Sequence, residues 1–353
     1  MIDLINYGLN ERFLNEAGMY KDYEIARVIS ESRGIYRVVY KDDFIFANVS
    51  GKFRYELIRN DDYPAVGDFV MVSVEGDRGI IHKVLSRKSV FSRSAVGVKG
   101  QTQIVASNVD VVFICMSLNK NFNLNRLERY LSIGYDSGAI PVVILTKSDL
   151  CKDVEDARNK VFKVAPFADI IDISYNEDVL EKLSPYLKKG ATAAFIGSSG
   201  VGKSTLINRI IGSDEIETHD TDKADKGRHT TTRRELISLN NGAVLIDTPG
   251  MRELGIETAD IDKTFTDIDE LSELCKFRDC SHTNEPGCAV IMALKEGKLD
   301  KRRYENYLKL KKEMKYDGMS SKKLEEEKLE RIFKDVGGMK NARKYIRESN
   351  KRK

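Results

Sequence analysis

The sequence lacks any apolar run approaching the roughly 20 residues that a membrane-spanning helix requires. Residues 1–7 show no basic segment followed by an apolar core, so we expect no secretory signal peptide and a cytoplasmic location. Hydrophobic residues make up 41% and charged residues 32% of the 353 positions, which is typical of a soluble globular chain. A chain of this length predicts two or three domains, each with its own core.

The chain also has little net charge and few cysteines. A formal charge of +3 excludes a polycation, so only local basic stretches can indicate a nucleic-acid partner. Of the five cysteines, Cys275, Cys280 and Cys288 lie close together, which in a cytoplasmic chain favours a metal site over disulfides. Cys115 and Cys151 are interpreted as isolated thiols.

Residues 23–91 contain five short β-rich runs separated by Gly, Asp and Pro, at 25–29, 36–40, 44–49, 69–74 and 79–85. Regular spacing of this kind predicts a small barrel such as an OB-fold, many of which bind nucleic acids, although a barrel used only for packing is the alternative. The following Ser86–Gly100 is rich in Ser and Gly and carries basic residues without an acid. We interpret it as a domain linker with a basic face, either simply solvated or in contact with RNA.

From residue 109 the pattern becomes α/β. Buried strands are predicted at 109–116 and 141–145, with a helix at 124–131 between them. This alternation predicts a parallel sheet with helices on both faces. Residues 213–234 form a long polar stretch without periodicity, which is typical of a functional or mobile loop.

The most specific motif is a P-loop of the form G-x-x-x-x-G-K-[ST], here Gly197, Ser198, Ser199, Gly200, Val201, Gly202, Lys203 and Ser204. An apolar strand at 192–196 precedes it, and a helix at 205–211 follows it. Backbone N–H groups from the loop to Thr205 would hold the phosphates, with Lys203 on the β- and γ-phosphates and Ser204 on Mg²⁺. An ordinary glycine-rich turn is the bland alternative.

Directly after the strand that ends at Leu145 comes Thr146-Lys147-Ser148-Asp149, which resembles the [NT]-K-x-D signature of GTPases. The Asp149 carboxylate can accept from both guanine N1–H and the 2-amino group, and adenine offers neither donor. Lys147 would stack over the ring. Ser174 occupies the place of the supporting guanine loop, although Tyr175 follows it where a small residue is usual.

Three further segments complete a triphosphate site. A strand at 243–246 leads into Asp247-Thr248-Pro249-Gly250, where Asp247 would hold Mg²⁺ through water and the Gly250 N–H would touch the γ-phosphate. Upstream, either Thr231 or Thr230 can close over Mg²⁺ and the γ-phosphate, and Thr231 is our first choice. Met251 stands where many GTPases carry a water-orienting Gln, so His229 is the candidate to orient the attacking water. A structural or partner-facing role for His229 is the alternative.

The order of these motifs is unusual, because the guanine-reading segment precedes the P-loop. This order predicts a circularly permuted GTPase domain, whose switch segments lead directly into the module after residue 250. That module contains Cys275, Cys280, His282 and Cys288, a donor set typical of one structural tetrahedral Zn²⁺. A redox-active cysteine pair is the alternative. The tail at 340–353 is rich in Lys and Arg, which indicates either a solvated face or a contact with a phosphate backbone.

Together these motifs resemble the ribosome small-subunit-dependent GTPase family (RsgA, also called YjeQ), over nearly the whole chain. Gly227-Arg228-His229-Thr230-Thr231 before Asp247, Pro64 to Asp68, and Asn123-Leu124 add to the likeness. The resemblance implies an N-terminal OB-fold, a central permuted P-loop GTPase domain and a C-terminal zinc-binding α-helical domain, for which we expect the ranges 1–94, 95–258 and 259–353. The resemblance also implies a catalytic role for His229.

The resemblance also implies a function. The chain would bind the small ribosomal subunit and its rRNA, assist late subunit maturation, and leave after subunit-stimulated hydrolysis of GTP to GDP. We expect a monomer without a membrane partner. A P-loop ATPase or kinase, and an RNA-binding protein with a vestigial nucleotide site, are the competing readings. Asp149 argues against the first, and the intact Lys203, Ser204, Asp247 and Gly250 argue against the second.

Overall fold

The computed structural model describes residues 3–57, 59–94, 102–174, 176–212, 235–247 and 261–316. Several predicted features lie outside these residues and remain predictions. They are the polar stretch 213–234 with His229, Thr230 and Thr231, then Tyr175, Gly250, Met251 and the basic tail at 340–353. Among the described residues, no helix combines the length and apolar character needed to cross a bilayer.

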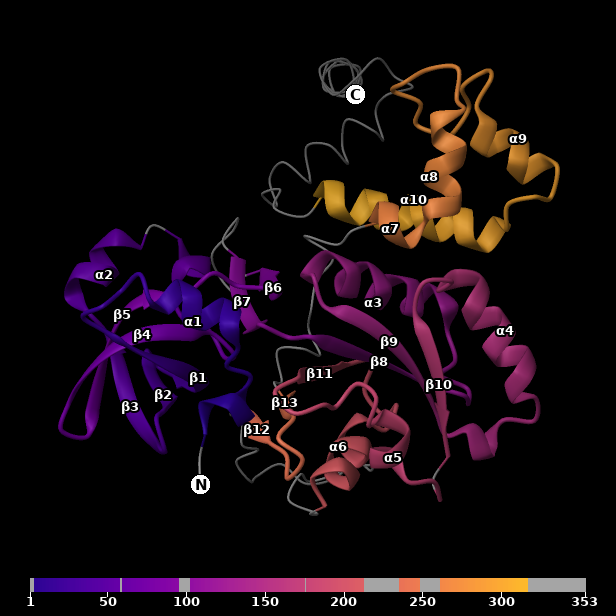
Figure 1. Cartoon of the computed structure of the whole chain (residues 1–353). Coiled ribbons are helices and arrows are strands. Elements are labelled where there is room, and N and C mark those ends of the chain that lie inside the picture. Colours follow the sequence, from indigo (N-terminus) through magenta and orange to yellow (C-terminus); the bar gives the residue numbers. More distant parts are fainter. Residues whose placement is uncertain are drawn as a thin grey trace, which may run out of the picture.

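The N-terminal part is a closed five-stranded barrel in the order β1-β2-β3-β5-β4, as predicted (Figure 1). Its β3 and β5 pair in parallel and the other described pairs are antiparallel. Alternation of the side chains fills the interior, since Ile45, Ala47 and Val49 of β3 are buried whereas Phe46 faces outward. The strands are β1 Glu24–Ser32, β2 Ile35–Tyr40, β3 Asp43–Val49, β4 Phe69–Glu75 and β5 Arg78–Val84.

Short helices pack against this barrel. Helix α2 (Gly51–Glu56) connects β3 to β4 and is capped by the Ser50 hydroxyl. Before β1, η1 (Leu4–Tyr7) leads into α1 (Glu11–Ala17), which Asn10 caps. The ring of Phe13 in α1 packs on that of Phe69 with centroids 4.1 Å apart, so α1 covers part of the barrel.

The predicted linker at Ser86–Gly100 is in part folded. Strand β6 (Val90–Ser94) pairs with β7 (Thr102–Ser107), and the expected boundary at 94/95 falls between these two strands. Two of the four basic side chains of this segment form ion pairs with acidic residues elsewhere in the chain. Arg87 contacts the buried Asp68 at 2.7 Å, and Lys88 contacts Asp110 at 2.5 Å. The prediction of a basic face is therefore wrong for Arg87 and Lys88, because their acidic partners lie outside the segment.

Arg27 fastens the barrel to the central sheet. It is 1% exposed, and its guanidinium donates to Gly67 O, Tyr7 O and Thr192 Oγ1. Gly67, with φ of 97°, lies so close to β7 that a Cβ would come within 2.1 Å of Ser107 O. A buried cation thus joins the barrel to the central sheet, and a backbone approach that only glycine permits joins the barrel to β7.

The central part is a six-stranded sheet in the order β10-β9-β8-β11-β13-β12. All described neighbours pair in parallel except the edge strand β12, which is antiparallel to β13. The four predicted strands are present, and β10 and β12 at the two edges are additional. The bounds are β8 Val111–Ser117, β9 Ile140–Thr146, β10 Asp169–Ile173, β11 Thr192–Ile196, β12 Glu235–Ser238 and β13 Val244–Asp247.

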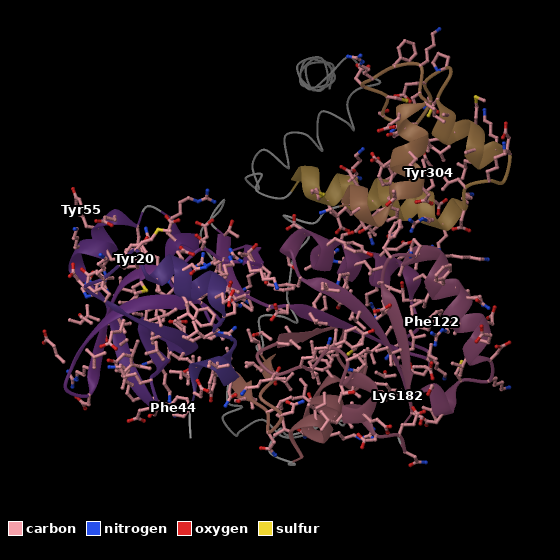
Figure 2. All side chains as sticks on the ribbon, in the orientation of Figure 1. Tyr20, Phe44, Tyr55, Phe122, Lys182 and Tyr304 are labelled. Atoms are coloured by element: carbon pink, nitrogen blue, oxygen red, sulfur yellow. The ribbon has the colours of Figure 1, made fainter. Side chains whose placement is uncertain are left out.

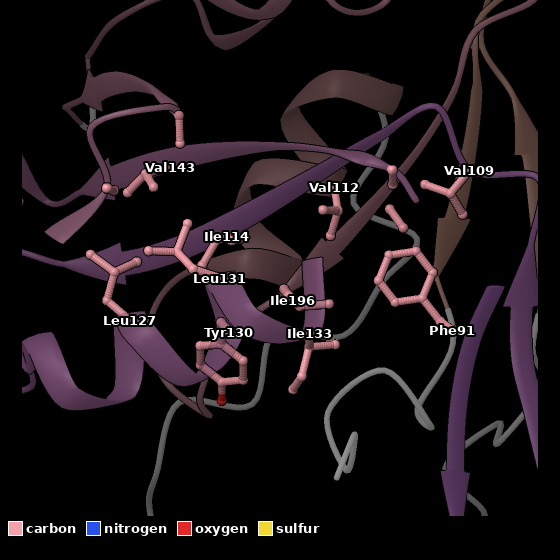
Figure 3. Close-up of a cluster of buried hydrophobic side chains, with 14 of the residues drawn as sticks. Phe91, Val109, Val112, Ile114, Leu127, Tyr130, Leu131, Ile133, Val143 and Ile196 are labelled. Atoms are coloured by element: carbon pink, nitrogen blue, oxygen red, sulfur yellow. The ribbon is translucent and has the colours of Figure 1, made fainter. Parts of the chain in front are cut away.

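Helices cover both faces of the sheet, as the sequence predicts. On β8, Val112 and Ile114 belong to the core beneath α3 and α4, whereas Phe113 and Cys115 belong to the core beneath α5 and α6 (Figure 3 shows the first of these cores). Successive residues of a strand point to opposite faces, which explains why a strand covered on both sides is apolar throughout. The helices are α3 Leu124–Ser137, α4 Val154–Val164, α5 Val179–Leu183 and α6 Lys203–Ile211.

The C-terminal part is helical and lies over α3 (Figure 1). Its helices are α7 Ile261–Thr264, α8 Thr266–Glu273, α9 Ala289–Lys295 and α10 Lys301–Tyr316. Thr264 shares a hydrogen bond of 2.8 Å with Ser132 of α3. This packing places the cysteine-rich segment on the same side of the sheet as the first turn of α3.

Candidate active site and metal centre

The P-loop connects the end of β11 to α6 at the carboxyl edge of the sheet. Three of its glycines have positive φ: Gly197 (144°), Gly200 (76°) and Gly202 (96°). A Cβ on Gly197 would lie 2.6 Å from Cys115 O, so this position also requires glycine for space. The loop therefore adopts a tight wrap that places the N-terminus of α6 behind any bound phosphate.

Lys203 is held against the inside of this loop. Its side chain is 7% exposed, and Nζ donates to Gly197 O at 2.5 Å and to Ser198 O at 2.7 Å. A cation fixed in this way is preorganised for phosphate. The neighbouring Cys115 is a packing residue, because burial raises the pKa of its thiol to about 12 and keeps it protonated.

The segment 146–149 lies directly against the P-loop. Thr146 Oγ1 donates to Val201 O at 2.6 Å, and Lys147 Nζ donates to Gly200 O at 3.1 Å. Lys147 is left-handed (φ 58°) and is followed by the short helix η3 (Ser148–Leu150), which carries the exposed Asp149. Thr146, which replaces the commoner Asn, thus still links this segment to the P-loop, and Asp149 lies two residues after Lys147, which also contacts the loop.

Ser174 also reaches this edge of the sheet. It follows β10, whose last residue Ile173 pairs with Thr146. The Ser174 N–H donates to Glu177 Oε2 at 2.7 Å, and Arg209 of α6 donates to Ser174 O at 3.4 Å. Hydrogen bonds from Lys182 and from the Ser174 backbone lower the pKa of Glu177, which stabilises this loop with a carboxylate at neutral pH.

Asp247 is the last residue of β13, the strand next to β11. The pairing of Ala194 with Ile246 places Asp247 opposite Phe195, beside the start of the P-loop. The structure therefore gathers the P-loop, the 146–149 segment, Ser174 and Asp247 along one sheet edge, where nucleotide sites of parallel sheets occur. Strand β9, which ends at Thr146, comes before β11, which leads into the P-loop, in the sequence. The guanine-reading segment therefore precedes the P-loop within one sheet, which is the permuted order.

One residue at this edge was not predicted from the sequence. Arg126, in the first turn of α3, donates from Nη1 to Ser198 Oγ at 2.9 Å. Asn123 caps that turn by accepting from the Arg126 N–H at 3.0 Å. The only sequence signal for a role of Arg126 is the helix cap at Asn123 after a buried strand, because the partner of Arg126, Ser198, lies 72 residues farther along the chain.

The four predicted metal ligands come together at the start of the C-terminal helices. Ligand atoms of Cys275, Cys280, His282 and Cys288 all lie within 4.8 Å of one another. Sγ of Cys275 is 3.8 Å from Sγ of Cys288, and His282 Nδ1 is 3.6 Å from each of these sulfurs. A regular tetrahedron with Zn–S of about 2.3 Å and Zn–N of about 2.0–2.1 Å requires separations of roughly 3.8 and 3.5 Å. The cluster is compatible with zinc.

Surrounding contacts fix these ligands. His282 and Cys288 are 5% and 3% exposed, and burial lowers the pKa of His282, which favours the neutral imidazole that metals bind. The Tyr304 hydroxyl of α10 donates to His282 O at 2.5 Å (Tyr304 is labelled in Figure 2). The sulfur separation of 3.8 Å is far from the roughly 2.05 Å of a disulfide, so these two cysteines are not joined.

Comparison with known proteins agrees with this geometry. The RsgA GTPase family model matches residues 84–257. An ABC transporter model matches residues 180–346, a range that contains the P-loop but not Asp149. Two solved structures are similar at 27% identity over 83% of this chain. They are YloQ, titled a circularly permuted GTPase (TM-score 0.59, 95% of that chain), and YjeQ from Thermotoga maritima (0.60, 98%).

Curated relatives extend the match to almost the full length. The small ribosomal subunit biogenesis GTPase RsgA 2 of Lactiplantibacillus plantarum is 45% identical, covering 98% of both chains. The protein of the same name from Listeria monocytogenes is 44% identical, covering 89% of this chain and 90% of that one. Identity at this level across barrel, sheet and cysteine cluster shows that the chain belongs to the RsgA GTPase family.

Proposed function

We propose that this protein is a GTPase that binds the small ribosomal subunit, assists its late maturation and hydrolyses GTP to GDP and phosphate. The observation that carries the proposal is the contact of Thr146 and Lys147 with the P-loop carbonyls of Val201 and Gly200. It brings a carboxylate suited to guanine, Asp149, to the loop suited to phosphates. The names of the full-length relatives support the ribosomal role.

In this site the chain's own groups bind and orient the nucleotide. Backbone N–H groups of the P-loop through Thr205, together with Lys203, hold the phosphates, and Asp149, Lys147 and Ser174 hold the guanine. Ser204, Thr231 and water on Asp247 would hold Mg²⁺, which neutralises charge on the phosphates when bound. Gly250 would contact the γ-phosphate, Thr230 is the alternative to Thr231, and His229 would orient the water. Of these residues, His229, Thr230, Thr231 and Gly250 are proposed from the sequence alone.

The C-terminal cluster is proposed to hold one structural Zn²⁺. Three thiolates and one imidazole fill a tetrahedral site and leave no position open for a substrate. The metal would hold the segment between α8 and α9, and through Tyr304 it would fix the direction of α10. This assigns the ion to folding of the helical part and not to the reaction.

The barrel is proposed to contact rRNA through its outer face. Phe46 is 61% exposed and lies in register between Arg37 of β2 and Arg78 of β5. The Arg37 guanidinium sits 4.5 Å from the ring centroid of Phe44, and neither arginine forms an ion pair with any residue the structure describes. An exposed ring between two cations fits a base stacked on the aromatic face with its phosphates beside the arginines.

Turnover measurements with purified small ribosomal subunits test this function. The wild-type chain is expected to hydrolyse GTP and not ATP, and to do so faster when subunits are present. His229→Ala is expected to lose most of the stimulation while still binding GDP. A chain that turns over ATP equally well, or that ignores the subunits, would contradict the proposal, and undiminished stimulation in the variant would contradict the role of His229.

A further inference from the structure

The first turn of α3 lies beside the P-loop. Strands β8 and β11 are parallel neighbours, with Ile114 opposite Ile196, so the segments after both strands emerge at the same edge. Arg126 sits in that turn and reaches across to the P-loop hydroxyl of Ser198. Ser198 O in turn accepts from Lys203 Nζ, so a single loop residue holds two cations, one on its carbonyl and one on its hydroxyl.

Arg126 differs from the other arginines near it in its partners. Arg129 pairs with Glu313 at 2.5 Å, and Arg303 pairs with Glu128 at 2.9 Å. Arg126 is half-buried, and among the residues the structure describes it has no carboxylate within ion-pair distance; its side-chain hydrogen bond goes to a neutral hydroxyl. A guanidinium remains charged at all accessible pH values, so within the described part of the chain this cation stands next to the phosphate loop without a compensating anion.

We propose that Arg126 is a catalytic arginine supplied in cis, whose guanidinium moves from Ser198 Oγ to the terminal phosphate of GTP. The inference rests on the proposed GTPase function and adds a residue to it. A neutral hydroxyl is a weak hydrogen-bond acceptor for a guanidinium. A phosphate is a stronger one, because it is charged and accepts two parallel hydrogen bonds from the guanidinium. Ser198 directly precedes the backbone groups that would hold the phosphates, so the new partner lies within the reach of the same side chain.

The chemical role is electrostatic. During hydrolysis the water oxygen bonds to the γ-phosphorus while the bond from that phosphorus to the β–γ bridging oxygen breaks. The electron pair remains on GDP, and the proton of the water passes to the phosphate product. Arg126 neither gives nor takes a proton in this step; it stabilises the negative charge on the transferred group, a part that arginines play in other P-loop GTPases.

A purely structural role for Arg126 makes a different prediction. If its bond to Ser198 only braces the P-loop, loss of the side chain should weaken binding of GDP and GTP to the same degree. A catalytic arginine instead lowers the rate of the chemical step and spares GDP, which lacks the terminal phosphate. Comparison of the single-turnover rate with GDP affinity therefore separates the two roles.

The test uses the full-length chain with Mg²⁺, as wild type, Arg126→Ala, Arg126→Lys and Arg129→Ala. Arg129→Ala is the matched control, because it removes the same side-chain type from the same helix at a surface ion pair. We expect Arg126→Ala to lower the single-turnover hydrolysis rate by at least about 20-fold, the effect of an arginine in cis. GDP affinity should change less than about twofold, Arg126→Lys should recover part of the rate, and the control should match wild type.

A hydrolysis rate for Arg126→Ala within twofold of wild type would overturn the inference. So would losses of GDP and GTP affinity as large as the loss of rate. Failure of the proposed function has a separate signature, because the wild-type chain itself would then show no GTP hydrolysis.

Discussion

Arg303 Nη1 of α10 donates a hydrogen bond of 2.9 Å to Oε1 of Glu128, a fully buried carboxylate on α3. Arg302 and Asn306 bond the same carboxylate, and Arg303 continues to Asp267 of α8 at 2.7 Å. Burial lowers the pKa of Arg303, but its bonds with Asp267 and Glu128 outweigh this and leave the pKa raised. This cluster ties the helical part to the central domain, two residues away from Arg126.

Replacing Glu128 with Ala should destabilise the protein strongly. The change leaves Arg303, with a side chain only 7% exposed, short of a buried anion, and breaking a buried pair in this way costs about 3–5 kcal/mol. Glu313→Ala is the control, because the Arg129–Glu313 pair is 34% exposed on both sides and such pairs contribute about 0–1 kcal/mol. Urea unfolding followed by circular dichroism measures both, and equal losses would contradict this ranking.

Asp149→Asn should change base preference. The amide keeps one acceptor oxygen and replaces the other with an NH₂ donor, so it can accept from guanine N1–H but meets the 2-amino group donor to donor, and GTP affinity should fall by at least about 100-fold. Xanthine carries an oxygen in place of the 2-amino group and can accept from the new amide, so xanthosine triphosphate should bind the variant better than GTP does. Competition against a fluorescent nucleotide measures this, and unchanged GTP affinity would remove Asp149 from the site.

Zinc removal should unfold the cysteine-rich segment before the rest. Native mass spectrometry is expected to find one zinc ion per chain, and a strong chelator should release it and raise hydrogen exchange across 275–295. Cys275→Ser should lose the metal, whereas Cys151→Ser should retain it, because Cys151 lies outside the cluster. Retention of zinc by Cys275→Ser, or no change in exchange after chelation, would contradict a structural metal.

The pH dependence of the barrel should reflect His82. Its ring stacks on Tyr23 at 4.1 Å and its Nε2 lies 2.8 Å from Ser73 Oγ, and burial lowers its pKa in the folded state. A lowered pKa means that the unfolded chain takes up the proton first, so this contribution to stability is present above about pH 6.5 and is lost as the pH falls. His82→Phe keeps the stacking without the titration, so its melting temperature should drop less between pH 7.5 and pH 5 than that of wild type. An equal drop would contradict the assignment.

The sequence predicted the parts of the site that are contiguous. The P-loop, Thr146 to Asp149 and the four metal ligands each occupy a short stretch whose spacing reflects local geometry. Arg126 and Glu128 escaped prediction because their partners, Ser198 and Arg303, are 72 and 175 residues away. In the sequence, such charged residues on a helix are indistinguishable from those of an ordinary solvent-exposed face. Only the packing of α10 on α3 shows which of them are buried.

The same limit explains the errors in the fold. Strands β10 and β12 were missed because edge strands are short and carry charged residues such as Asp169, Asp172 and Glu235. The basic residues of 86–88 looked free because Asp68 and Asp110 are distant in sequence. Periodicity identifies buried central strands reliably, whereas pairing across the fold has no local signal.

The outer face of the barrel gives the last prediction. Phe46→Ala should weaken binding of the full-length chain to a labelled single-stranded oligouridine by about 5- to 160-fold, because stacking one base on an aromatic ring contributes roughly 1–3 kcal/mol. Phe46→Trp should preserve or tighten binding, since the larger ring offers the same flat surface between Arg37 and Arg78.

Phe167→Ala is the matched control, because Phe167 is 71% exposed and lies outside the barrel. Binding to a duplex of equal length should be little changed in all three variants, since paired bases cannot stack on the ring. Equal losses in Phe46→Ala and Phe167→Ala, or an equal loss for duplex and single strand, would mean that the barrel attracts RNA by charge alone and that Phe46 does not stack on a base.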